Sequence, residues 1–117
     1  MNIKISRVTI QDINTLQDLS IVTFSETFGK QNPPKDLELY LDKAFNRRQL
    51  TQEINDPHSS FYFISHGMLP VGYIKWKNAN IPEYSSLGEA LEVERLYVRK
   101  DYQRLGLGKY LLDFAYV

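Results

Sequence analysis

The sequence has no cysteine, no net charge and no long hydrophobic run, and each absence removes a class of function. Without cysteine, the 117-residue chain cannot form a disulfide framework or a thiolate metal site, and it has no thiol to carry an acyl group. Fourteen basic side chains balance fourteen acidic ones, which does not favour a nucleic-acid or membrane-surface binder. No run of 18 apolar residues predicts a membrane span and no signal-peptide pattern is present, so we expect a cytoplasmic location.

The composition is that of a folded protein. Hydrophobic residues make up 43% of the chain and charged residues 24%, which excludes a disordered or collagen-like protein. A chain of this length fits one hydrophobic core. We therefore expect residues 1–117 to belong to a single domain.

The first half of the chain has helical spacing after one short strand. Residues 3–8 read as a strand, and Thr9 with Asp12 three residues later predicts the start of a helix. Pro34 is well placed to begin a second helix, and Asn46 is a typical cap for a third, short one.

The second half begins with strand patterns and ends in a helix. Residues 59–66 and 71–77 are rich in aromatic and β-branched side chains, and the turn residues at 67–70 join them into a β-hairpin. Residues 90–98 predict a longer strand, and residues 103–108 turn the chain into a final helix. Strands and helices together predict an α/β domain.

The turn after the last strand carries the clearest chemical signal. Gly106 and Gly108 flank Leu107 at the start of a helix, where N–H groups are unpaired and the helix dipole favours an anion. The sequence lacks a P-loop and a complete dinucleotide fingerprint, which argues against ATP and NAD. A diphosphate bound by a short turn is the remaining prediction. Basic residues exceed acidic ones around this turn: Arg95, Arg99, Lys100, Arg104 and Lys109 against Asp101.

These residues resemble a known motif. The run 103–108, preceded by residues 96–98 and followed by 109–112, resembles the acetyl-coenzyme A motif of the GCN5-related N-acetyltransferases (GNAT superfamily). Residues 23–46 are similar to the PaiA-type spermidine/spermine N-acetyltransferases. The resemblance implies an α/β GNAT fold, with a mixed, mostly antiparallel sheet flanked by helices. It also implies acetyl-CoA as cosubstrate and direct attack by the acceptor amine, without a covalent enzyme intermediate.

The resemblance also implies roles for individual residues around the turn. Backbone groups of Leu96, Tyr97 and Val98 are expected to contact the pantetheine arm. The residues expected to wrap the pyrophosphate are Gln103, Arg104, Leu105, Gly106, Leu107, Gly108 and Lys109.

Acyl transfer to an amine needs a base, because an alkylammonium with a pKa near 10.4 loses its proton at pH 7 at a cost of about 4.6 kcal/mol. Strand alternation predicts that Glu92 and Glu94 share a face with Leu96 and Val98, toward the reacting thioester. Glu92 is the first choice for the base. Two glutamates that only solvate an exposed strand face are the structural alternative.

A polyamine acceptor would need carboxylates along its groove, and the candidates are Glu26, Glu83 and Glu89. Two alternatives stay open: an acetyltransferase acting on a protein or peptide amine, and a non-catalytic acyl-CoA-binding regulatory protein. The sequence predicts no metal site and no nucleic-acid partner.

The sequence ends inside the helix that follows the glycine turn. In the family this helix leads to further strands, a helix and a tyrosine that protonates the departing thiolate. We therefore expect residues 1–117 to be the N-terminal portion of a GNAT domain, inactive or impaired alone. An exposed edge strand would favour a homodimer or other self-association.

Overall fold

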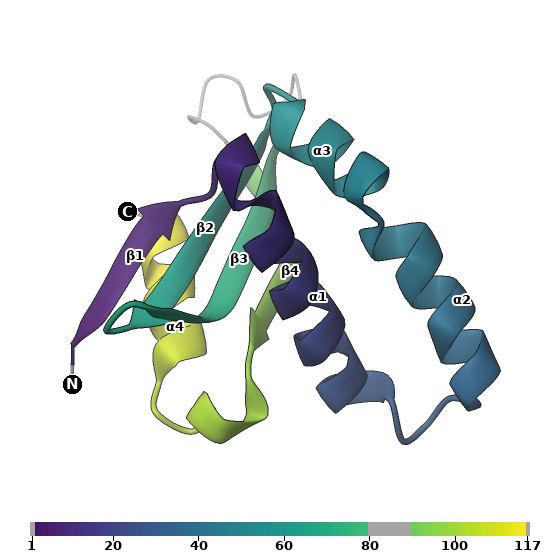
Figure 1. Ribbon diagram of the computed structural model, residues 1–117. Helices are drawn as coiled ribbons and strands as arrows, with labels where there is room; N and C mark the ends of the chain where they lie inside the picture. The colour runs from purple at the N-terminus through teal and green to yellow at the C-terminus, as the bar shows by residue number, and fades with distance from the viewer. Residues whose placement is uncertain (1, 80–89, 117) are drawn as a thin grey trace.

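A computed structural model describes residues 2–79 and 90–116. Its centre is a four-stranded sheet in the order β1-β2-β3-β4, in which every neighbouring pair is antiparallel (Figure 1). β1 and β4 form the two edges of this sheet. The strands are β1 (Ile3–Arg7), β2 (Ser59–His66), β3 (Leu69–Ala79) and β4 (Ala90–Val98).

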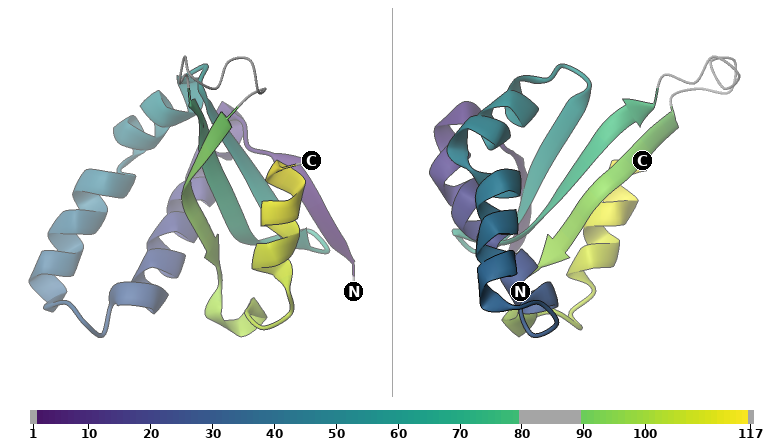
Figure 2. Two further views of the ribbon diagram at one scale, coloured as in Figure 1. Left: turned by 180° about the vertical axis from the view of Figure 1, so that it is seen from behind. Right: turned by 90° about the vertical axis from the view of Figure 1, so that its right-hand side faces the viewer.

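Helices cover both faces of the sheet. Three of them, α1 to α3, lie on one face and α4 lies on the other (Figure 2). This arrangement confirms the predicted α/β fold class. None of the described helices is long and apolar enough to cross a membrane. The helices are α1 (Ile13–Phe28), α2 (Pro34–Phe45), α3 (Arg47–Asn55) and α4 (Leu107–Ala115), with the 3-10 turns η1 (Ile10–Asp12) and η3 (Lys100–Tyr102).

The predicted helix starts are confirmed. The Asp12 carboxylate accepts a hydrogen bond from the Thr9 amide at 2.8 Å, closing the capping box before α1. Pro34 occupies the first turn of α2, where its missing N–H costs no hydrogen bond. The Asn46 Oδ1 atom accepts from the Gln49 amide at 2.8 Å and so caps α3.

Each face of the sheet has its own apolar core. On the α1–α3 face, Leu16, Phe45, Leu50 and Tyr73 are almost completely buried. On the α4 face the core forms around fully buried aliphatic side chains: Ile64, Val71, Ile74 and Leu111. Leu107 and Leu111 of α4 belong to this core, which therefore fixes the helix that begins at the glycine turn.

A β-bulge in β4 changes which side chains face which core. Val93 pairs with Trp76 and Arg95 with Lys75, so Glu94 is an extra residue on β4. Val93 then packs on the α4 side together with Leu96, although simple alternation would place them on opposite faces.

The prediction that Glu92 and Glu94 share a face with Leu96 and Val98 is therefore wrong. The inserted residue, Glu94, shifts the alternation of the strand. Glu92 is the neighbour of Val93, which faces α4, so Glu92 lies on the opposite face, the one covered by α1 to α3.

Candidate coenzyme turn and active site

The segment between β4 and α4 combines two left-handed residues with a helix start. Arg104 has φ +69° and Gly106 has φ +78°, and α4 begins at Leu107. Glycine adopts a positive φ at little cost because it has no β-carbon. Left-handed residues that alternate with right-handed ones turn neighbouring amides toward one side and can so form a concave site for an anion.

Several amides of this turn and of the first turn of α4 lack a protein partner. The Tyr102 and Gln103 amides bond back to the carbonyls of Arg99 and Lys100. None of the next six amides, those of residues 104–109, donates a hydrogen bond to a described residue. Backbone donors left without a protein partner are satisfied by water or by a ligand. These six amides, at the start of a helix, are therefore available to an anionic ligand.

An open hollow of about 400 Å³ lies beside these amides. It brings together most of the residues that the sequence predicted for the coenzyme: Leu96, Val98, Gln103, Arg104, Gly106, Leu107 and Gly108, with Tyr102 added. Three predicted residues do not line it. The side chain of Tyr97 packs against the α1–α3 core, Leu105 is exposed, and Lys109 pairs with Asp113 at 2.8 Å. Only the backbone groups of Tyr97 are therefore available to a ligand in the hollow.

The start of the turn is anchored at three points. The Arg99 amide donates to the Val71 carbonyl at 2.7 Å, and the Gln103 side-chain amide donates to the Val98 carbonyl at 3.0 Å. The third anchor comes from α1, where Glu26 Oε1 accepts from the Lys100 amide at 3.0 Å. Glu26 was predicted to bind the acceptor, and the structure places its carboxylate against the coenzyme turn.

On the opposite face, four charged side chains form a compact ion-pair cluster. Arg95 donates two hydrogen bonds to Glu53, at 2.8 and 2.9 Å. Lys75, only 5% exposed, lies 2.7 Å from Glu94 and 3.7 Å from Glu53. Burial opposes ionisation of Glu53, but hydrogen bonds from Arg95 and Gln49 outweigh it and hold the pKa of Glu53 below its ordinary value.

Sequence reasoning missed Glu53 and Lys75. A signal was available for Lys75, because it stands two residues after Tyr73 in a strand and so shares its buried face. A charged side chain at a buried strand position requires an opposite charge nearby.

The two candidate bases on β4 differ in their surroundings. The Glu94 carboxylate is bound to the Lys75 ammonium. Glu92 is exposed and makes no hydrogen bond or ion pair with any described residue. A carboxylate without a partner is free to accept a proton, so Glu92 suits a base better than Glu94.

Two predicted acceptor residues, Glu83 and Glu89, lie outside the described residues. Among the residues that are described, no three His, Cys, Asp or Glu side chains gather as a metal site would require. Burial raises the pKa of Tyr73 to about 12 and also raises the pKa of Tyr97, so neither of these two phenols is readily ionised.

An antiparallel sheet covered by helices on both faces, with a strand–turn–helix of unpartnered amides beside a hollow at one edge, defines the class of the protein as an α/β domain with a candidate ligand site. The sequence profile of the acetyltransferase (GNAT) domain matches residues 24–116. The chain therefore belongs to the GNAT family, as the resemblance implied.

Comparison with individual proteins agrees with this assignment. An uncharacterised N-acetyltransferase of Lactobacillus delbrueckii subsp. lactis is 38% identical over 97% of the chain, which spans 65% of that relative's length. The PaiA N-acetyltransferase of Thermoplasma acidophilum, solved in complex with coenzyme A, superposes with a TM-score of 0.82 at 23% identity, over 99% of this chain and 70% of its own. An aminoglycoside acetyltransferase from an uncultured soil sample, in complex with sisomicin, gives a TM-score of 0.71 at 20% identity, over 97% and 67%.

Proposed function

We propose that the chain binds acetyl-CoA in the turn 103–109 and is part of an N-acetyltransferase that acetylates an amine. The observation that carries the proposal is the run of six free amides at residues 104–109 beside the hollow. A diphosphate needs several N–H donors and positive charge, and this turn supplies both without a metal ion. The backbone at Leu96 to Val98, which continues from the hollow along β4, suits the amide groups of the pantetheine arm.

The chemistry requires a neutral amine next to the thioester. The amine nitrogen attacks the carbonyl carbon, the C–S bond breaks, and coenzyme A leaves as a thiolate that takes up a proton. Glu92 is the base that removes the proton from the amine, because its carboxylate has no partner among the described residues. Glu92 and the hollow lie on opposite faces of β4, an edge strand of the described sheet. Coenzyme and amine can thus approach that edge from two sides.

For the acceptor we propose a polyamine such as spermidine or spermine. The similarity to PaiA-type enzymes supports this choice, and the Glu26 carboxylate, exposed near the end of α1, is one group that could bind an ammonium. The Lys100 amide donates to Glu26 Oε1, and Oε2 accepts no hydrogen bond from the described residues. A protein or peptide amine is the alternative acceptor.

The experiment is calorimetric titration with coenzyme A, followed by an assay of thiol release from acetyl-CoA with spermidine or with a lysine peptide. Binding of coenzyme A with faster release in the presence of spermidine supports the full proposal. Binding without any turnover supports an acyl-CoA-binding role for this chain, and absence of binding contradicts the proposal at its root.

A further inference from the structure

Arg104 has a backbone conformation that its residue type disfavours. Among the described residues it is the only one with a positive φ, +69°, that is not glycine. Gly106, two residues later, takes a similar conformation at φ +78° without strain, because it has no β-carbon. Strained backbone persists where the surrounding structure compensates it, and it gathers at functional sites. An arginine in place of glycine at this position therefore points to a role for its side chain.

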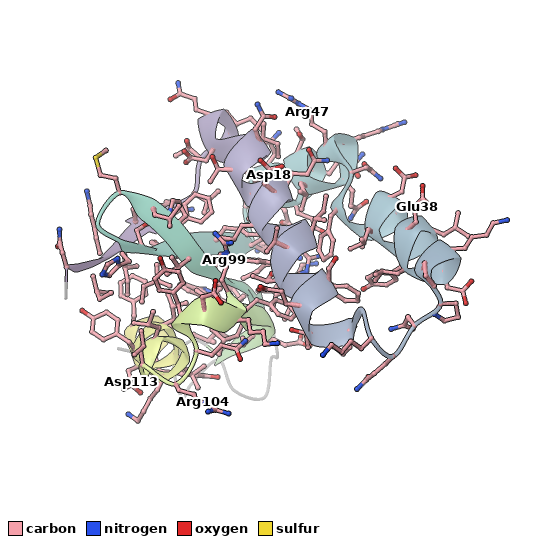
Figure 3. The ribbon with its side chains drawn as sticks, turned by 60° about the horizontal axis from the view of Figure 1, so that its bottom comes forward. Asp18, Glu38, Arg47, Arg99, Arg104 and Asp113 are labelled. Atoms are coloured by element: carbon pink, nitrogen blue, oxygen red, sulfur yellow. The ribbon has the colours of Figure 1, made fainter. Side chains whose placement is uncertain are left out.

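The Arg104 guanidinium has no protein partner within the described part of the chain. It makes no hydrogen bond and no ion pair there, although the residue lines the hollow. Figure 3 shows its side chain reaching outward from the turn, clear of the helices. The other cation of the turn, Lys109, is already paired with Asp113. Among the described residues, Arg104 is therefore the basic residue that lines the hollow and has no protein partner.

We propose that Arg104 is a coenzyme-specificity residue that binds the phosphate on the 3′ carbon of the ribose and so selects coenzyme A over dephospho-coenzyme A. This inference rests on the proposed function. The unpartnered amides of residues 104–109 supply donors for the diphosphate. The Arg104 guanidinium is then available for the third phosphate of coenzyme A, the one on the ribose. A guanidinium matches phosphate because its planar fork donates two parallel hydrogen bonds.

Two substitutions separate the charge of Arg104 from its backbone strain. Arg104→Gln removes the charge and keeps the β-carbon, whereas Arg104→Gly removes both. We expect each variant to bind coenzyme A roughly tenfold more weakly than the unaltered protein in calorimetric titration, as for a lost charge-assisted hydrogen bond. Affinity for dephospho-coenzyme A should stay unchanged. Arg104→Gly should also raise the thermal unfolding midpoint, because glycine relieves the strain.

The control is Arg48→Gln, which removes the same charge from an exposed residue of α3 on the other face of the sheet. It should leave both affinities as they are. If Arg104→Gln weakens the affinities for both ligands equally, or weakens neither affinity, the inference is overturned, while the proposed function of binding coenzyme A stands. An unaltered protein that binds neither ligand contradicts the proposed function itself.

Discussion

The two sides of β4 use polar groups in opposite ways. On the α1–α3 side, two carboxylates and two cations pair with one another at 2.7 to 3.7 Å, with Lys75 almost fully buried. On the α4 side, six consecutive amides and the Arg104 guanidinium have no partner among the described residues. Paired groups stabilise the fold, whereas groups left unpaired around a hollow are available to a ligand. The comparison predicts that changes to the cluster affect stability and changes to the turn affect binding.

The largest effect is expected from Glu53→Gln, which removes the carboxylate that Arg95 and Lys75 share. Breaking a buried ion pair leaves an uncompensated charge and costs about 3 kcal/mol of unfolding free energy. Denaturant unfolding measures it. Asp113→Asn is the matched control, because it breaks the exposed pair with Lys109 and should cost no more than about 0.5 kcal/mol. Equal losses in the two variants would show that the cluster does not stabilise the fold.

The same carboxylate predicts how stability depends on pH. The folded-state pKa of Glu53 lies below its ordinary value of 4.5, so the stabilisation that its carboxylate provides is present above pH 4.5. As the pH falls below 4.5 and through the lower folded pKa, Glu53 takes up a proton and the stabilisation is lost. Unfolding free energies measured at several pH values should therefore fall less steeply for Glu53→Gln than for the unaltered protein. Parallel curves would contradict the assignment.

Gly108→Ala should weaken coenzyme binding without harming the fold. No atom lies within 4 Å of a β-carbon placed on Gly108, and alanine favours a helix over glycine by up to about 1 kcal/mol. Its methyl group would enter the hollow and hinder a diphosphate from approaching the amides. We expect unchanged or higher stability and at least roughly tenfold weaker binding of coenzyme A. Unchanged affinity would indicate that the ligand binds elsewhere.

Gly106→Ala tests the left-handed turn itself. Space is again available for a β-carbon, but φ is +78°, so the substitution should cost about 1 kcal/mol of unfolding free energy through backbone strain alone. Comparison of denaturation curves with those of Gly108→Ala isolates this term. Equal stability of the two alanine variants would argue against a left-handed residue at position 106.

The smallest effect is expected from Glu26→Ala, which removes one exposed anchor of the turn. Loss of the 3.0 Å hydrogen bond from the Lys100 amide should weaken coenzyme binding roughly threefold, since an exposed hydrogen bond contributes near the lower end of the usual net range of about 0.5–1.5 kcal/mol. Asp18→Ala, on the same helix and without a hydrogen bond to a described residue, should leave the affinity unchanged. If both variants behave alike, Glu26 does not hold the turn.

Local signals in the sequence were sufficient for most of the fold. Thr9 with Asp12, Pro34 and Asn46 mark helix starts through contacts within a few residues, and the structure has helices at those places. The glycine turn was predictable for the same reason, because φ at Gly106 and the free amides are properties of a short segment. The bulge at Glu94 was not, since it arises from pairing with β3 and shows only in the register. The ion-pair cluster likewise joins α3, β3 and β4, which no local pattern connects.

The most direct test is an NMR titration of the ¹⁵N-labelled chain with coenzyme A, following each backbone amide. We predict that the amides of residues 104–109 show the largest chemical-shift changes, as expected for N–H groups that acquire an anionic acceptor, while the amide signals of Lys75 and Arg95 barely move. Saturable binding of coenzyme A that leaves residues 104–109 unshifted would contradict it.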